Sequence, residues 1–136
     1  LELGGVKIDL RKIKVPVYIL STKEDHIAPW KSTFAATQLY SGNTKFVLAS
    51  SGHIAGVVNP PASNRYSYRT NAKKAKTPAA WLEGATEHNG SWWPDWDKWV
   101  KKFADGEVAA RVPGKGKLKA IEDAPGSYVK VRSQES

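Results

Sequence analysis

Two residues of this sequence combine the side chains and the placement that acid–base chemistry needs, Asp25 and His53. Each follows a short apolar run and lies in a loop of polar or small residues. A carboxylate beside an imidazole fixes the tautomer of the ring and stabilises the imidazolium that forms when the ring takes a proton. Together the two residues predict general acid–base catalysis. Taken singly, the alternative readings are a turn or helix-cap aspartate and a solvated loop histidine.

The elements expected around these residues place both at one edge of a sheet. Residues 15–21 form a nearly continuous apolar run, typical of a strand covered on both faces. Residues 30–40 have helical spacing and end at a Ser-Gly-Asn stop, and residues 45–49 predict a second buried strand. A strand, a helix and a strand form a βαβ unit, and the loops that follow its parallel strands meet at the same edge.

The rest of the chain is less regular. Residues 62–77 are polar and basic and predict a surface loop, whereas residues 78–84 predict a short helix. Residues 106–116 are loop-like, and residues 128–131 predict a short strand pair.

A further helix is expected to begin at Pro94. Its apolar residues have the i, i+3, i+4, i+7 spacing of a stripe that faces a core, namely Trp96, Trp99, Val100 and Phe103. Six tryptophans in one chain also suit an aromatic platform for carbohydrate or single-stranded nucleic acid. The helical spacing favours core packing over that alternative.

Composition limits the chemistry further. The sequence has no cysteine, so disulfides, thiolate metal sites and a cysteine nucleophile are impossible within this chain. No serine stands in a Gly-x-Ser-x-Gly turn, and no apolar stretch has the length of a membrane span. The net charge of +8 suits an anionic partner, but the basic residues are spread from Lys7 to Arg132 rather than gathered on one element, which argues against a dedicated nucleic-acid domain.

Six stretches of the sequence closely resemble class I polyhydroxyalkanoate synthases, and the resemblance covers nearly the whole chain in order. They are residues 24–30 (Glu-Asp-His-Ile-Ala-Pro-Trp), 51–57 (Ser-Gly-His-Ile-Ala-Gly-Val), 59–61 (Asn-Pro-Pro), 81–85 (Trp-Leu-Glu-Gly-Ala), 90–96 (Gly-Ser-Trp-Trp-Pro-Asp-Trp) and 125–130 (Pro-Gly-Ser-Tyr-Val-Lys). The resemblance implies that residues 1–136 are the C-terminal portion of an α/β-hydrolase-like catalytic domain. It makes Asp25 and His53 the acid and base of a Cys-His-Asp triad whose cysteine lies outside this chain. The chain by itself is therefore expected to be inactive.

The resemblance also implies an activity. Synthases of this family polymerise (R)-3-hydroxyacyl-CoA, typically 3-hydroxybutyryl-CoA, into polyhydroxyalkanoate and release CoA, with no cofactor. It further implies a homodimer in the cytoplasm, attached to polyester granules. His26 is a candidate for the substrate or product path, and Arg65 and Arg69 are candidates for the CoA phosphates.

Three alternatives stay open at this point. One is another α/β-hydrolase, such as a thioesterase, an esterase or a depolymerase, with the same acid and histidine. Another is a non-enzymatic basic module that binds nucleic acid or an anionic granule surface. The last is a stabilising or interaction segment, with catalysis belonging to another chain.

Overall fold

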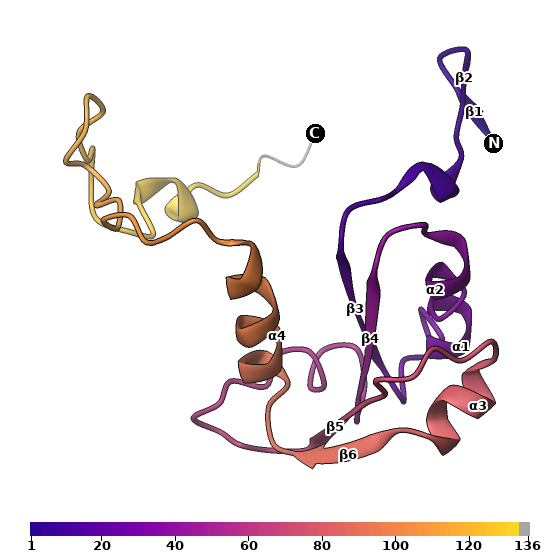
Figure 1. The fold of residues 1–136 in the computed structure, drawn as a ribbon. Coiled ribbons are helices and arrows are strands. Elements are labelled where there is room, and N and C mark those ends of the chain that lie inside the picture. The colour runs from indigo at the N-terminus through magenta and orange to yellow at the C-terminus, as the bar shows by residue number, and fades with distance from the viewer. Residues whose placement is uncertain (134–136) are drawn as a thin grey trace. The chain divides into compact units, whose positions relative to one another are not determined.

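The computed structural model describes residues 1–133, and the chain divides into two units, Leu1–Phe103 and Ala104–Ser136. The first unit is an α/β structure built on a four-stranded sheet of order β3-β4-β5-β6 (Figure 1). Its strands are β3 (Val17–Thr22), β4 (Thr44–Ala49), β5 (Ser67–Thr70) and β6 (Thr86–Asn89). β3 and β4 are parallel, which confirms the predicted βαβ unit, whereas β5 and β6 continue the sheet as antiparallel strands.

Side chains alternate across the parallel pair, so each strand supplies both faces of the sheet. One face carries the apolar core, in which Ile19 and Phe46 are paired across the two strands. Helices α1 (Trp30–Thr33), α2 (Ala36–Leu39) and α3 (Pro78–Glu83) lie on this side (Figure 1). The buried core residues are Trp30, Phe34, Phe46, Leu48 and Trp81.

The helix expected over residues 30–40 is interrupted. Ala35, Thr37 and Gln38 donate their backbone N–H groups three residues back rather than four, which tightens the chain between α1 and α2. Thr33 and Thr37 also return their hydroxyls to the carbonyls of Trp30 and Phe34. Such hydroxyl bonds compete with the regular helical ladder, so two short helices replace one.

Helix α3 matches its prediction closely. The Thr77 hydroxyl caps it by accepting from the backbone N–H of Ala80, and Pro78 occupies the first turn. Gly84 ends the helix where the Asn71 side chain passes, and a Cβ there would lie 2.9 Å from Asn71 Nδ2.

The opposite side of β3 and β4 is covered by α4 (Trp93–Val100), which continues into the 3₁₀ turn η2 (Lys101–Phe103) (Figure 1). Asp95 in its first turn accepts from the Tyr18 hydroxyl at 2.9 Å and pairs with Lys45 at 2.7 Å. Burial, and then the Asp95 charge, raise the pKa of Tyr18, so its hydroxyl stays protonated and keeps donating. Trp99 packs edge-on against the same ring.

The predicted core-facing stripe of this helix is only partly right. Trp99 reaches the sheet, but Trp96 and Phe103 are 42% and 52% exposed. The polar contacts of Asp95 orient the helix, and they leave Trp96 outside the contact with Tyr18.

The surface loop predicted over residues 62–77 is wrong for four of its residues. Ser67–Thr70 forms β5, which pairs with β4 on one side and β6 on the other. Each position in this strand gains from a cross-strand partner, such as Arg69 opposite Glu87 and Tyr68 stacked on His88. Strands β5 and β6 are too short and too polar to be predicted from the sequence pattern.

The remaining regular elements of the described residues are an N-terminal hairpin with the turn that follows it in the first unit and a short helix in the second. In the first unit, β1 (Glu2–Leu3) and β2 (Val6–Lys7) form a hairpin whose turn residues Gly4 and Gly5 both have positive φ, and η1 (Leu10–Lys12) follows it. Described by itself, the second unit is largely exposed. Its one regular element among the described residues is η3 (Ser127–Lys130), a 3₁₀ helix that replaces the strand predicted at 128–131.

A local contact explains why this segment forms a 3₁₀ helix and not a strand. The carboxylate of Glu122 accepts from both the backbone N–H and the hydroxyl of Ser127, which winds the chain into a turn at the start of η3. No strand lies beside it among residues 104–133 to offer ladder bonds. The loop expected at 106–116 is confirmed. Within residues 1–133, no helix has the length and apolar character needed to cross a membrane.

The aromatic core gives a first testable prediction. Trp81→Ala removes a side chain that is 3% exposed and lies 5.0 Å, centroid to centroid, from Phe46. We expect the variant to lose about 3–5 kcal/mol of unfolding free energy, measured by urea denaturation. Trp96→Ala is the matched control, and its 42% exposed indole predicts a much smaller loss. Equal losses for the two variants would contradict the packing described above.

Candidate active site

The pairing of β3 with β4 continues past the ends of both strands. Beyond the last paired residues, Thr22 and Ala49, the backbone N–H of Lys23 donates to the carbonyl of Ala49 at 2.8 Å. The backbone N–H of Glu24 then donates to the carbonyl of Ser51 at 3.0 Å. The loops that carry Asp25 and His53 are thus tied together at the carboxyl edge of the parallel strands, as the sequence predicted.

Asp25 is fixed by its own loop. Its Oδ1 accepts from the backbone N–H groups of Ile27 at 2.8 Å and Ala28 at 2.9 Å, and its side chain is 12% exposed. The Ala28 hydrogen bond, with smaller help from Ile27, His53 and His26, lowers the pKa of this carboxyl below its ordinary value. Asp25 is therefore a carboxylate at neutral pH and cannot turn freely.

His53 lies opposite, on a tight turn. Ser51 has φ +70°, in the left-handed region, and Gly52 accepts from the backbone N–H of Gly56, which closes one turn of chain around His53. His53 Nδ1 is 3.8 Å from Asp25 Oδ1, and its side chain is 39% exposed. This separation is longer than a hydrogen bond. The two side chains are nevertheless neighbours at the same edge of the sheet, and Nε2 is the other ring nitrogen, which can meet a reacting group.

The other predicted site residues separate into two groups. The ring of His26 meets that of His53 edge-on, with centroids 5.6 Å apart, so Asp25, His26 and His53 come together. Arg69 instead pairs with Glu87 at 2.7 Å, which compensates its charge. Arg65 lies in the exposed loop before β5, and its carbonyl accepts from the side chain of Asn59.

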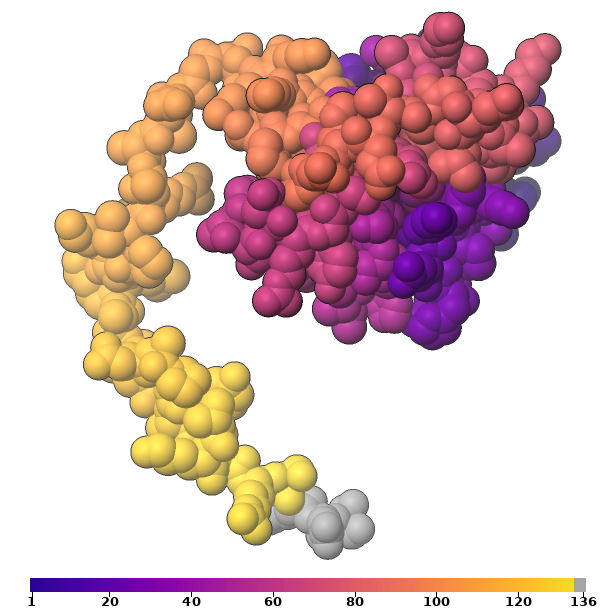
Figure 2. Space-filling model, turned by 90° about the horizontal axis from the view of Figure 1, so that it is seen from below, coloured from indigo at the N-terminus to yellow at the C-terminus, as the bar shows by residue number. Residues whose placement is uncertain are grey.

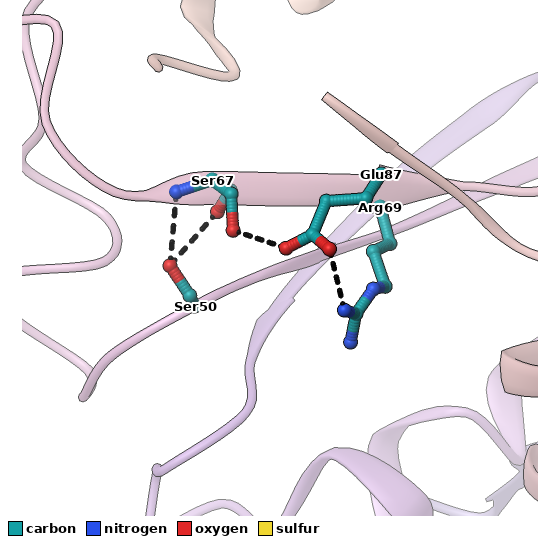
Figure 3. A network of polar contacts seen from close by, with 4 residues as sticks. All are labelled: Ser50, Ser67, Arg69 and Glu87. Carbon is teal, nitrogen blue, oxygen red and sulfur yellow. Dashed lines mark hydrogen bonds and ion pairs between the residues drawn. The ribbon is translucent and has the colours of Figure 1, made fainter. Parts of the chain in front are cut away.

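Sequence reasoning missed a chain of polar contacts behind the His53 turn. It joins Ser50, Ser67, Glu87 and Arg69 (Figure 3). It also missed the role of Gly56, where a Cβ would collide with the carbonyl of Ser50 and lie 2.7 Å from the methyl carbon of Thr22. The only available signal was a glycine three residues after the candidate histidine.

An apolar groove adjoins the end of the same turn, and the sequence did not predict it. Trp92 and Trp93 both donate their indole N–H groups to the carbonyl of Val57, at 3.2 and 3.0 Å. In Figure 2 the magenta segment around residues 50–70 accordingly lies beside the salmon and orange segment of residues 80–100. The groove has a volume of about 650 Å³ and is lined by Val57, Val58, Pro61, Trp92, Trp93, Pro94, Trp96 and Asp97.

An acid and a histidine held at the carboxyl edge of two parallel strands are typical of an α/β enzyme. Comparison with known proteins gives the family. The chain is 48% identical over 98% of its length to a poly(3-hydroxyalkanoate) polymerase subunit PhaC of Cupriavidus necator. It is 48% identical over 96% of its length to a PhaC subunit of Rhizobium etli, and 38% identical over 97% to poly(3-hydroxyalkanoate) polymerase 1 of Ectopseudomonas oleovorans. No protein-family model matches.

The chain therefore belongs to the poly(3-hydroxyalkanoate) polymerase family, a family of enzymes. It spans between a fifth and a quarter of the length of these relatives, 23% of the Cupriavidus necator protein and 21% of the Rhizobium etli protein. This agrees with the resemblance stated from the sequence motifs.

The packing at Gly56 gives a second prediction. Gly56→Ala places a Cβ against the Ser50 carbonyl, which is main chain and cannot swing aside. We expect a loss of about 1–3 kcal/mol in unfolding free energy and a displaced His53 turn. Gly116→Ala is the control, since nothing lies within 4 Å of a Cβ there. An unchanged melting temperature for the Gly56 variant would show that the turn has room that this structure lacks.

The lowered pKa of Asp25 gives a third prediction, on pH. A carboxyl whose folded pKa lies below its unfolded value stabilises the fold above the unfolded pKa, and this contribution disappears as pH falls through the folded pKa. Wild type should therefore melt above Asp25→Asn at neutral pH, and the difference should shrink on acidification from about pH 5 to about pH 2. Thermal melts across this range test it. A difference that grows on acidification would mean that the charged form is not the favoured one.

Proposed function

We propose that the protein containing this chain is a polyhydroxyalkanoate synthase. In this proposal it polymerises (R)-3-hydroxyacyl-CoA, typically 3-hydroxybutyryl-CoA, and releases CoA. This chain supplies the acid Asp25 and the base His53 of a Cys-His-Asp triad. The main support is the 3.8 Å approach of these two side chains in a chain that is 48% identical to poly(3-hydroxyalkanoate) polymerases.

The proposed fold of the complete catalytic domain is that of the α/β-hydrolases, with this chain as its C-terminal portion. The order of acid and then histidine after two neighbouring parallel strands supports it, because the nucleophile of that fold lies upstream of both. The nucleophile is proposed to be a cysteine, which this sequence does not contain.

The first chemical step would be acylation. His53 takes the proton of the cysteine thiol, because the thiolate is the effective nucleophile. The thiolate attacks the thioester carbonyl of the substrate, a new C–S bond forms, and the C–S bond to CoA breaks. The proton on His53 then returns to the departing CoA thiolate. Asp25, held as a carboxylate by the Ile27 and Ala28 N–H groups, stabilises the imidazolium between these events.

The second step would lengthen the polymer. The 3-hydroxyl of one unit attacks the thioester carbonyl of another, so an ester C–O bond forms, the C–S bond of that thioester breaks and its thiolate departs. The hydroxyl must lose its proton as it attacks, and His53, or Asp25 acting with it, is the proposed base, which passes the proton to the departing thiolate.

Secondary roles follow from position and charge. His26 is proposed to line the substrate or product path, which its contact with the His53 ring supports. Arg65 is proposed to attract the CoA phosphates, since it is exposed in the loop before β5. Arg69 is the weaker candidate of the two arginines because Glu87 already neutralises it. We further propose a homodimer that works in the cytoplasm at the surface of polyester granules.

The proposed activity gives a fourth prediction, for the complete protein. His53→Gln should lower kcat for CoA release from (R)-3-hydroxybutyryl-CoA by about three orders of magnitude, because the change removes the proposed base for the nucleophile's proton. The assay follows CoA with a thiol reagent and weighs the insoluble polyester. His88→Gln is the control, because His88 lies on β6 and stacks on Tyr68 rather than on the Asp25 carboxylate.

The two readouts also separate the alternatives. CoA release with free 3-hydroxybutyrate and no polymer would identify a thioesterase instead. Polymerisation at the parental rate by the His53 variant would end the assignment of the base.

A further inference from the structure

The main chain leaves the sheet at Ser50, three residues before His53, and it does so in an unusual way. Ser50 and Ser67 stand opposite each other at the end of the β4–β5 ladder, where an antiparallel pair of this kind exchanges both backbone bonds. One bond is regular, from Ser50 N–H to the Ser67 carbonyl at 2.9 Å. The return bond from Ser67 N–H goes to the Ser50 hydroxyl oxygen at 3.0 Å. The hydroxyl thus takes the place of the Ser50 carbonyl.

This exchange releases the Ser50 carbonyl from the ladder. The carbonyl instead packs against Gly56, where no Cβ would fit, and the next residue takes a φ of +70°. The direction in which the His53 turn leaves the sheet is therefore set by how firmly Ser67 is held opposite Ser50.

Ser67 is held from its other side by β6. Its hydroxyl donates to Glu87 Oε1 at 2.7 Å, and Arg69, two residues along β5, donates to Glu87 Oε2 at the same distance (Figure 3). The hydrogen bonds from Ser67 and Arg69 lower the pKa of Glu87, and Lys23 adds a smaller effect. Lys23 lies two residues before Asp25, and it lines a cavity of about 60 Å³ with Ser50, Ser67, Arg69 and Glu87.

We propose that Ser67 and Glu87 are positioning residues for the proposed polymerase reaction, because their contact holds β5 where Ser50 can turn the chain toward His53. Neither residue touches the reacting atoms. Both act through the angle of the His53 turn relative to Asp25. This inference rests on the proposed function of His53.

The test uses the complete protein and the variants Ser67→Ala, Glu87→Ala and the double variant. Each single change should lower kcat for CoA release from (R)-3-hydroxybutyryl-CoA about tenfold with KM nearly unchanged, since a misplaced base weakens the chemical step and not substrate binding. The double variant should be no worse than either single one, because both changes break the same contact. Glu87→Gln keeps an oxygen that accepts from Ser67 and should recover most of the loss.

Asp97→Ala is the matched control. Asp97 and Glu87 are 49% and 48% exposed, and each pairs with a basic side chain at 2.7 Å, but Asp97 lies on α4 and pairs with Lys101. Its kcat should stay at the parental value. Hydrogen exchange gives a readout that needs no activity. Amides of residues 50–56 should exchange faster in Glu87→Ala and unchanged in Asp97→Ala.

The outcomes separate the inference from the function. If His53→Gln is inactive while Glu87→Ala and Ser67→Ala keep parental kcat, the positioning role is wrong and the function stands. A rise in KM that accounts for the whole loss would also overturn it, because it would indicate substrate contact. If His53→Gln stays active, the proposed role of His53 as the base fails, and the exchange of residues 50–56 still reports whether Glu87 holds the turn.

Discussion

Parallel pairing between β3 and β4 is the constraint on which the rest of the first unit depends. It persists past both strand ends through the bonds from Lys23 N–H and Glu24 N–H, so the two following loops are part of the ladder rather than free connections. Since these bonds tie the two loops together, a carboxylate and an imidazole that are distant in sequence lie 3.8 Å apart. Packing on both faces of the sheet then helps to keep these two strands paired, with aromatic residues on one face and the Asp95 contacts on the other.

The two halves of the site are held by different means. Asp25 is fixed within its own loop, because two backbone N–H groups bind one carboxylate oxygen and keep it charged. Among the described residues no backbone N–H group binds the His53 ring, whose position instead depends on a turn that leaves the sheet at Ser50 and packs closely at Gly56. In the proposed mechanism, Asp25 is therefore held by its own loop, whereas the position of His53 depends on contacts made elsewhere in the sheet.

The sequence predicted the parts of this site that repeat simple patterns. The apolar runs of residues 15–21 and 45–49 predict buried strands, and the positions of Asp25 and His53 follow from where these runs end. Strands β5 and β6 were missed because their short, polar segments gain stability from partners rather than from propensity, such as Glu87 with Ser67 and Arg69. The break between α1 and α2 and the exposure of Trp96 likewise arise from particular side-chain contacts, which periodicity does not carry.

The Asp95 contacts have a consequence for how β3 and β4 can move relative to each other. One carboxylate binds Tyr18 of β3 and Lys45 of β4, residues that are direct cross-strand partners. If one strand slipped along the other, one of these two bonds would therefore have to stretch. The contact lies four residues before the end of β3, which is about 13 Å along the strand at the usual rise per residue. Helix α4 ties the two strands together from one face of the sheet, so the spacing between the Asp25 and His53 loops depends partly on a tryptophan-rich helix that bears neither residue.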